Sequence, residues 1–192
     1  MTEPPVKSDR TWWIIGLGFV IAWVLYLIFF GPKPTVELSP PRLATSAEPK
    51  EVDYGWTVRD LHEKPVPFER YRGKAVFLNI WATWCPPCVA ELPSIARLAA
   101  DPRLKEVAFL CVSTDESAEA VRGFLRGKDW PMAVLRATSL PDVLTTDGIP
   151  ATFLVAPDGR IVATEVGAAA WDDPTAVEYL EKLARPAAEV RP

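Results

Sequence analysis

Hydrophobic residues are distributed along this chain in three distinct ways. Residues 12–30, WWIIGLGFVIAWVLYLIFF, carry no charge, and a helix of about 20 apolar residues spans the hydrocarbon core of a bilayer. Residues 31–51 contain five prolines and show no hydrophobic periodicity, which is typical of an extended tether. Apolar runs and amphipathic stretches alternate over residues 52–184, and residues 185–192 are predicted to be a loose tail.

The first segment is predicted to be an uncleaved transmembrane anchor that follows a short N-terminal segment, residues 1–11. A cleaved signal peptide, the main alternative, would have a shorter apolar core with small residues just behind it. Here the bulky sequence FFGPKP follows instead. A buried helix of a soluble protein is the third interpretation. Basic residues are balanced on the two sides of the segment, so they do not fix its orientation.

The pattern over residues 52–184 predicts an α/β domain with a mixed sheet and helices on both of its faces. Continuous apolar runs of buried-strand length occur at residues 75–81 and 107–113. A helix is expected to begin at the two prolines that follow the first run and to end near residue 100. The other predicted elements are a hairpin at 54–68, strands at 132–135, 152–156 and 160–166, and helices at 117–127, 140–146 and 174–184.

Composition and charge exclude some classes of function. The net charge of −4 and the lack of a basic stripe with interleaved aromatic residues argue against nucleic-acid binding. The chain has three cysteines and a single histidine, His62. Cys111, in the middle of a predicted strand, is expected to be a buried core thiol, and His62 is expected to be an exposed turn residue.

The other two cysteines, Cys85 and Cys88, lie in the stretch NIWATWCPPCVAELP, where a predicted strand gives way to a helix. Cys85 is expected to cap this helix, because Pro86 suits the first helical position, where a missing N–H costs nothing. A helix N-terminus favours negative charge and should lower the pKa of the Cys85 thiol. The spacing of three residues puts Cys88 on the same face, within reach of a disulfide.

Such a pair is suited to thiol–disulfide exchange, in which one thiolate attacks a disulfide and the second thiol releases the mixed disulfide. Two other interpretations are weaker. A metal clamp would need two more ligands, and Cys111 and His62 are poorly placed for that role. A purely structural disulfide would close so short a loop that it would remove little entropy from the unfolded chain. We therefore expect no metal and no cofactor.

A resemblance supports the exchange interpretation. FLNIWATWCPPCVAELP resembles the active-site segment of the TlpA/ResA/CcmG-type thioredoxin-like proteins, and GIPATFLVAPDGRIV at residues 148–162 is similar to their second signature. The resemblance extends over residues 52–184. It implies a thioredoxin-like fold and a thiol-disulfide oxidoreductase anchored by one helix in the bacterial cytoplasmic (inner) membrane. Residues 1–11 would then lie in the cytoplasm, and the catalytic domain would face the periplasm.

The resemblance also implies roles for individual residues. Cys85 takes the role of the exposed nucleophile and Cys88 that of the resolving thiol, so that the two form the redox-active disulfide. Glu91, one helical turn beyond Cys88, takes the role of an acidic residue that tunes the thiols and moves a proton. An exposed helix carboxylate is the alternative for Glu91.

A second set of implied roles concerns the substrate. Ile149 and Pro150 match a pair whose proline is cis and presents backbone to an extended substrate. Trp84 would cover the edge of the disulfide and help to position the substrate, whereas Trp81 would belong mainly to the core.

Partners are implied in the same way. Clients would be proteins with reducible cysteines, such as apocytochrome c or copper-site subunits of cytochrome oxidase, and a DsbD- or CcdA-like membrane protein would supply electrons. A copper-delivery module is the alternative, but copper carriers of this fold add a distal histidine and often methionines, and here only Met1 and Met132 exist. A peroxidase of related fold would need a threonine where Ala82 stands.

Overall fold

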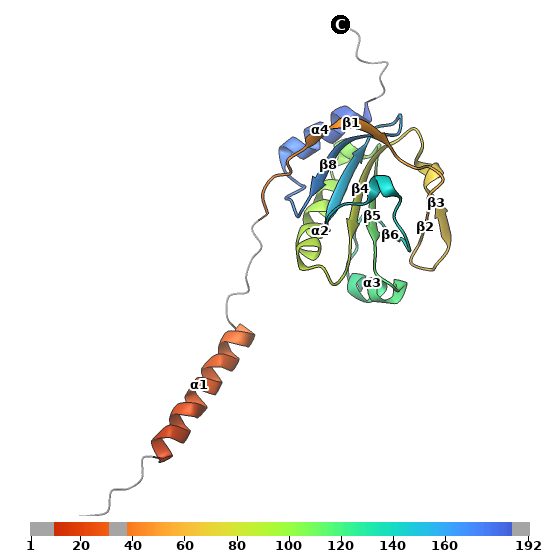
Figure 1. Ribbon diagram of the computed structural model, residues 1–192. Coiled ribbons are helices and arrows are strands. Elements are labelled where there is room, and N and C mark those ends of the chain that lie inside the picture. The colour runs from red at the N-terminus through yellow and green to blue at the C-terminus, as the bar shows by residue number, and fades with distance from the viewer. Residues whose placement is uncertain (1–9, 31–37, 186–192) are drawn as a thin grey trace, which may run out of the picture. The chain divides into compact units, whose positions relative to one another are not determined.

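The computed structural model describes residues 10–30 and 38–185 (Figure 1). The chain divides into two units, residues 1–36 and 37–192. In the first unit, α1 (Arg10–Phe30) has 21 residues, and its described large apolar side chains are exposed. Over the parts of the chain that the structure describes, no helix is both long enough and apolar enough to cross a membrane.

Parts of three predicted segments lie outside the described residues. They are residues 1–9 of the N-terminal segment, residues 31–37 of the tether and residues 186–192 of the tail. The transmembrane anchor expected at residues 12–30 stays a prediction.

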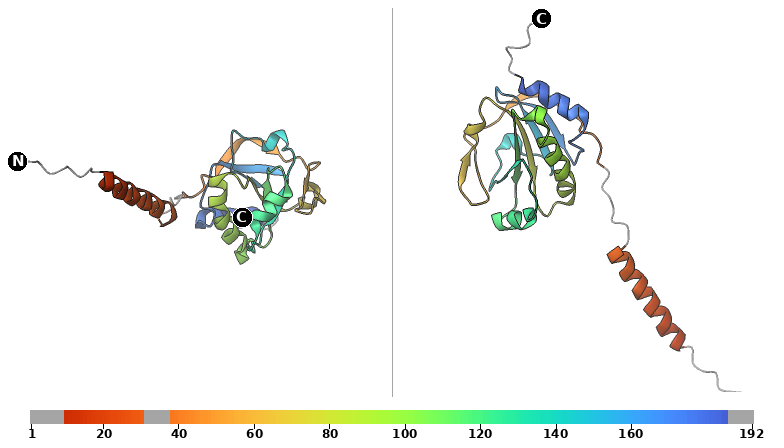
Figure 2. Two further views of the ribbon diagram at one scale, coloured as in Figure 1. Left: turned by 90° about the horizontal axis from the view of Figure 1, so that it is seen from below. Right: turned by 180° about the vertical axis from the view of Figure 1, so that it is seen from behind.

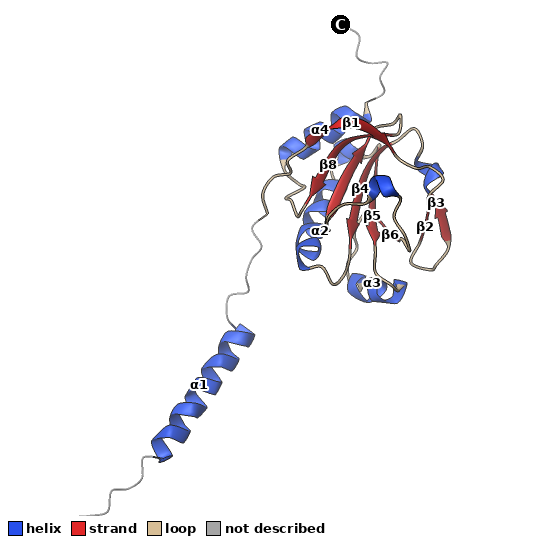
Figure 3. Ribbon diagram, in the orientation of Figure 1, coloured by secondary structure: helices blue, strands red, loops and turns tan. Residues whose placement is uncertain are grey.

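Over residues 38–185, the second unit contains one sheet of eight strands. The strands are β1 (Ala44–Glu51), β2 (Thr57–Arg59), β3 (Pro65–Pro67), β4 (Ala75–Trp81), β5 (Val107–Ser113), β6 (Ala133–Arg136), β7 (Ala151–Val155) and β8 (Arg160–Val166). Their order in the sheet is β1-β8-β7-β4-β5-β6-β2-β3. The α-helices are α2 (Pro86–Ala99), α3 (Ala118–Leu125) and α4 (Pro174–Ala184), and 3-10 helices occur at Phe68–Tyr71, Pro102–Leu104 and Asp142–Leu144 (Figure 3).

The centre of the sheet is formed by the two apolar runs of the sequence. β4 runs parallel to β5 and antiparallel to β7, which confirms the predicted mixed sheet. Side chains of a strand point alternately to its two faces. Phe77 and Trp81 of β4 therefore enter one core cluster, while Leu78 and Ile80 enter the other. Every residue of β4 is buried, because both faces of the sheet are covered.

The three α-helices described in this unit pack on one face of the sheet. Leu92 of α2, Val121 of α3 and Leu180 of α4 belong to the same core cluster as Phe77, and Figure 2 shows α2 and α4 side by side. Helices were expected on both faces, and the second face carries only short ones: two 3-10 helices cover it together with the β2–β3 hairpin. β4, β5 and β6 are parallel and lie next to one another in the sheet in the same order as in the chain. Right-handed crossovers therefore place the connecting helices α2 and α3 on the same side.

β1 lies inside the segment that the sequence predicted as a tether, residues 31–51. It pairs antiparallel with β8, and the register shifts between Thr45 and Lys50. Pro49 stands in this irregular stretch, where a sheet tolerates proline. The folded unit therefore begins ahead of the predicted boundary at residue 52. The hydrophobic pattern missed this strand because backbone groups pair whatever side chains they carry.

Most of the other predicted elements are present. β2 and β3 pair antiparallel as the expected hairpin, and His62 is exposed in its turn. α4 has the predicted bounds. The helix expected at residues 140–146 is reduced to the 3-10 helix Asp142–Leu144, which has no side-chain cap.

The contribution of β1 can be measured by truncation. A chain that begins at Leu38 is expected to be more stable than one that begins at Val52, because only the longer chain covers the outer edge of β8. A net backbone hydrogen bond contributes about 1 kcal/mol, so we expect a difference of about 2 kcal/mol in the free energy of unfolding by urea. Equal unfolding midpoints would show that β1 contributes nothing.

Candidate active site

The helix α2 begins at the Cys-Pro-Pro-Cys motif. Cys85 is its N-cap residue, in extended backbone conformation, and Pro86 and Pro87 occupy the first helical positions. The backbone N–H of Cys88 donates to Cys85 Sγ at 3.3 Å. Cys85 and Cys88 form a disulfide, with their Cα atoms 5.3 Å apart. The predicted cap and the predicted pairing of these two cysteines are therefore both present.

The disulfide is more deeply placed than the sequence suggested. Cys85 was expected to be exposed, but only 4% of its surface is accessible, and Cys88 is fully buried. The motif directly follows β4, whose C-terminal end lies inside the sheet between β5 and β7. Cys85 is therefore the cysteine of this pair that keeps some contact with solvent.

A loop from a distant part of the sequence closes over the disulfide. The Ile149–Pro150 peptide bond is cis, as the resemblance implied. The carbonyl oxygen of Ile149 lies 3.7 Å from Cys85 Sγ. β7 begins at Ala151, directly after Pro150, and pairs with β4. This pairing brings the loop to the sulfur atoms.

The two tryptophans before Cys85 differ sharply in environment. Trp84 is 68% exposed and so presents an indole ring to solvent next to the disulfide. Trp81 is fully buried, as expected, and its ring packs against Phe124 with 5.3 Å between centroids.

Glu91 is a buried carboxylate and not the exposed helix residue that was the alternative. Its Oε1 atom accepts a hydrogen bond from Asn79 Nδ2 at 2.8 Å. Its Oε2 atom accepts from Ala169 N and from Trp171 Nε1, each at 3.1 Å. Burial raises the pKa of Glu91 to about 7, although these three donors favour the charged form. The carboxyl group thus exchanges its proton near neutral pH.

Asn79, Trp171 and Thr152 were not identified from the sequence. Asn79 Nδ2 also donates to Thr152 Oγ1 at 2.9 Å, and both residues are buried. An amide inside the apolar run AVFLNIW was a usable signal, because a buried polar side chain needs hydrogen-bond partners. Nothing in the local sequence indicated Trp171, since its contact with Glu91 joins segments far apart in the chain.

A second buried carboxylate, also missed, holds the loop that precedes Cys85. Asp115 accepts hydrogen bonds from Thr83 N at 2.9 Å and from Thr83 Oγ1 at 2.6 Å. Ser113 Oγ donates to the same carboxylate at 2.6 Å. The segment WATWC is therefore fixed on one side by its own strand and on the other by the end of β5.

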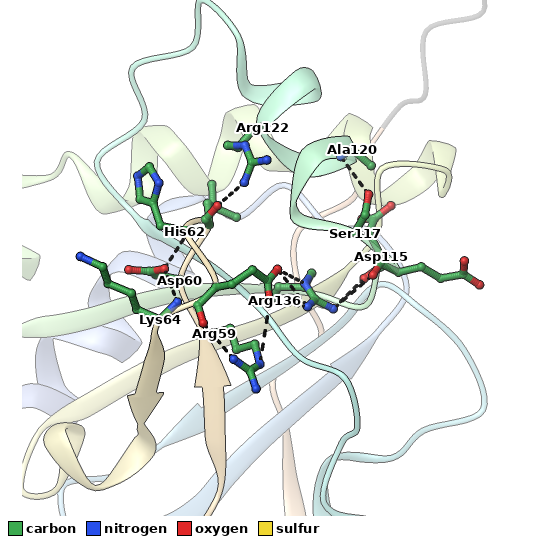
Figure 4. Close-up of polar contacts among 12 residues, drawn as sticks. Arg59, Asp60, His62, Lys64, Asp115, Ser117, Ala120, Arg122 and Arg136 are labelled. Carbon is green, nitrogen blue, oxygen red and sulfur yellow. Dashed lines mark hydrogen bonds and ion pairs between the residues drawn. The ribbon is translucent and has the colours of Figure 1, made fainter.

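Arg136 of β6 extends this brace to the turn of the β2–β3 hairpin (Figure 4). Its guanidinium donates to the carbonyl oxygens of Asp115 and Glu116 and pairs with Glu63 at 2.8 Å. Glu63 has a positive φ of 63°, and its hydrogen bond with Arg136 lowers its pKa. The hairpin turn is thus tied, through Arg136, to the segment after β5 whose Asp115 holds Thr83.

The remaining cysteine has no sign of reactivity. Cys111 is free and fully buried, as expected, and burial together with the charge of Glu91 raises its pKa far above neutrality. Among the described residues, no group of three or more potential ligands of the His, Cys, Asp or Glu type is placed to hold a metal ion.

Comparison with known proteins defines the class. Residues 57–180 match the Redoxin family, and the chain belongs to this family. Over 149 residues it is 30% identical to a thiol-disulfide oxidoreductase ResA of Bacillus cereus, covering 77% of this chain and 80% of that relative. It is 31% identical to ResA of Bacillus subtilis (strain 168) over 114 residues, covering 58% of this chain and 64% of that relative. The protein is a thiol-disulfide oxidoreductase similar to ResA.

Solved structures agree on the fold. The thiol:disulfide interchange protein from Chlorobium tepidum TLS, a thioredoxin family protein, superimposes with a TM-score of 0.58 at 23% identity, covering 71% of this chain and 99% of that chain. StoA from Bacillus subtilis superimposes with a TM-score of 0.54 at 19% identity, covering 68% of this chain and 96% of that chain. These similarities confirm the predicted thioredoxin-like fold.

The burial of Glu91 predicts a characteristic pH dependence of stability. Its pKa rises from 4.5 to about 7 on folding, so between these values the folded state holds a proton that the unfolded state has lost. The contribution of Glu91 to the free energy of unfolding is therefore fully present below pH 4.5 and is lost as pH rises through 7. The loss amounts to about 3 kcal/mol at 1.36 kcal/mol per pH unit.

The variant Glu91→Gln is expected to lack this loss, because glutamine does not titrate. Urea unfolding of the oxidised protein at pH 4, 6 and 8 measures the difference. Parallel stability curves for the two proteins would contradict the assignment of the buried, titrating carboxyl to Glu91.

Proposed function

We propose that this protein is a membrane-anchored reductant of disulfides in client proteins outside the cytoplasm. The observation that carries the proposal is the Cys85–Cys88 disulfide at the start of α2, with the cis-proline loop against it. The reduced form of such a pair can donate two electrons to a client disulfide. The clients proposed are apocytochrome c or copper-site subunits of cytochrome oxidase, and the proposed electron donor is a DsbD- or CcdA-like membrane protein.

Each cysteine has one step in the proposed reaction. The Cys85 thiolate attacks one sulfur of the client disulfide, which forms a mixed disulfide and releases the other client sulfur as a thiolate. Cys88 then loses its proton and attacks Cys85 Sγ, which frees the second client thiolate and forms the Cys85–Cys88 disulfide. Two electrons pass to the client, whose two thiolates take up protons.

Glu91 is proposed to handle the proton of Cys88. It lies one helical turn from Cys88 on α2, and its pKa of about 7 lets it take or give a proton at physiological pH. When ionised it also makes a second negative charge nearby more costly, which raises the thiol pKa.

The start of α2 favours a reducing couple over an oxidising one. Pro86 and Pro87 lack the N–H groups that a helix normally directs at a charge on its N-cap. The N–H of Cys88 remains as a donor to Cys85 Sγ. A less stabilised thiolate means a less stabilised reduced form, so the dithiol gives up its electrons more readily.

The proposed anchor is residues 12–30. This segment is uncharged, and the described side chains of its large apolar residues are exposed along α1. An exposed surface of this kind is unfavourable in water and suits the interior of a bilayer. The proposed orientation, with the catalytic domain on the periplasmic face, follows the resemblance to anchored relatives.

The reducing character gives a measurable potential. We expect equilibration with glutathione or dithiothreitol to place the couple between thioredoxin, at about −270 mV, and protein disulfide isomerase, at about −180 mV. A value near that of the strong oxidant DsbA, at about −120 mV, would mean that the protein introduces disulfides, and the reductant assignment would be wrong.

A trapping experiment tests the two cysteines and the location together. Cys88→Ser is expected to accumulate mixed disulfides with clients, because no thiol remains to release them. Cys85→Ser should form none, and Cys111→Ser, which alters a buried core thiol, is the control that should behave as wild type. Mass spectrometry then identifies the trapped proteins. Conjugates formed through Cys111, or conjugates with cytoplasmic proteins alone, would argue against the proposal.

A further inference from the structure

The active-site helix α2 is fastened to the segment just before α4, residues 169–172. Glu91 and Ser94 are three residues apart and therefore lie on the same side of the helix. Ser94 Oγ accepts a hydrogen bond from Trp171 N at 3.1 Å and lies 3.3 Å from the carbonyl oxygen of Ala169. Glu91 Oε2 accepts from the backbone N–H of Ala169. Backbone contacts therefore fix the position of this segment against α2.

Trp171 adds a side-chain contact to this attachment. Its indole Nε1 donates to Glu91 Oε2 at 3.1 Å. The side chain is fully buried, and its ring meets Phe77 edge-on, with centroids 4.9 Å apart and an interplanar angle of 88°. Because the backbone N–H and the ring are both held, the indole N–H has a fixed direction.

We propose that Trp171 is a positioning residue for thiol–disulfide exchange, whose indole N–H holds the Glu91 carboxylate as an ionised hydrogen-bond acceptor one helical turn from Cys88. This inference rests on the proposed role of Glu91. An indole N–H can only donate, so it stabilises the carboxylate more than the carboxylic acid. Hydrogen bonds to a charged group are also stronger than neutral ones.

Trp171 is the donor whose effect can be isolated. The Ala169 donor belongs to the backbone and survives any side-chain substitution. Asn79 shares its amide between Glu91 and Thr152, so its replacement disturbs two contacts. Replacement of Trp171 by phenylalanine removes the indole N–H and keeps an aromatic ring in the core.

Other charged and titratable groups near Glu91 are Glu165, Cys111 and the two motif cysteines. Burial is the main cause of its raised pKa, and the negative charge of Glu165 on β8 acts in the same direction. Cys111 on β5 stays protonated, because burial and the charge of Glu91 raise its pKa. In the oxidised protein Cys85 and Cys88 carry no titrating thiol.

The first test uses the oxidised wild-type protein, with Glu91→Gln as its control, and needs no replacement of Trp171. The indole proton resonance of Trp171, followed by NMR, is expected to move downfield as pH rises, with its midpoint at the pKa of Glu91. Trp81 provides the internal reference, because its buried Nε1 has no hydrogen-bond partner among the described residues. A Trp171 resonance that does not titrate, or that titrates unchanged in Glu91→Gln, would overturn the proposal.

The second test compares two tryptophan substitutions of equal size. The rate of Cys85 alkylation is measured against pH, and the step in this profile that Glu91→Gln removes is assigned to Glu91. In Trp171→Phe the loss of a donor destabilises the carboxylate, so the midpoint of this Glu91-dependent limb is expected to rise. A rise of about one pH unit corresponds to a tenfold change in the ionisation equilibrium. Trp81→Phe also removes a buried indole but breaks no hydrogen bond to Glu91, and its midpoint is expected to stay within a few tenths of wild type.

The outcomes separate this inference from the proposed function. If Glu91→Gln leaves the pH profile unchanged, the proposed role of Glu91 fails and the inference fails with it. If Glu91→Gln removes the limb while Trp171→Phe and Trp81→Phe shift it equally or not at all, Trp171 is a core residue only, and the role of Glu91 stands.

Discussion

The hydrogen-bonded burial of the Glu91 carboxylate is the constraint on which the active site depends. An unpaired charge in a protein interior is very costly, and this one is tolerated because three N–H groups from two parts of the chain point at it. These donors come from β4, from the backbone before α4 and from the Trp171 indole. The helix that carries the cysteines is therefore tied both to the sheet and to the chain before α4.

A second carboxylate completes this arrangement on the other side of the motif. Asp115 holds Thr83 through both its N–H and its hydroxyl, and Arg136 links that region to the hairpin turn. A buried acid thus holds the chain on each side of the motif: Asp115 binds Thr83 before Cys85, and Glu91 follows Cys88 on α2. Asp115 accepts hydroxyl and backbone hydrogen bonds and shapes the loop, and Glu91 fastens α2 to the sheet and to the chain before α4.

The sequence was informative wherever the structure follows from local pattern. The runs at 75–81 and 107–113 are buried strands with the expected bounds, and Cys85 caps α2 as its prolines indicated. The cis bond before Pro150 came from the family signature. Local pattern could not reveal β1, which pairs through its backbone with the distant strand β8, or the side of the sheet that α3 covers, which depends on strand order. The partners of Glu91 also join distant segments, so no spacing along the chain predicts them.

The edge of the sheet formed by β3 has a consequence for contacts with other polypeptide chains. β3 is the last strand in the described sheet, and Phe68 N donates across to Trp56 O, just beyond its end. Pairs alternate along an antiparallel ladder, so the nitrogen atoms of Pro65 and Pro67 face away from β2. Proline has no N–H to offer there. An extended polypeptide that approaches this edge finds acceptors without matching donors, so β3 is a poor template for the addition of a further strand from another chain.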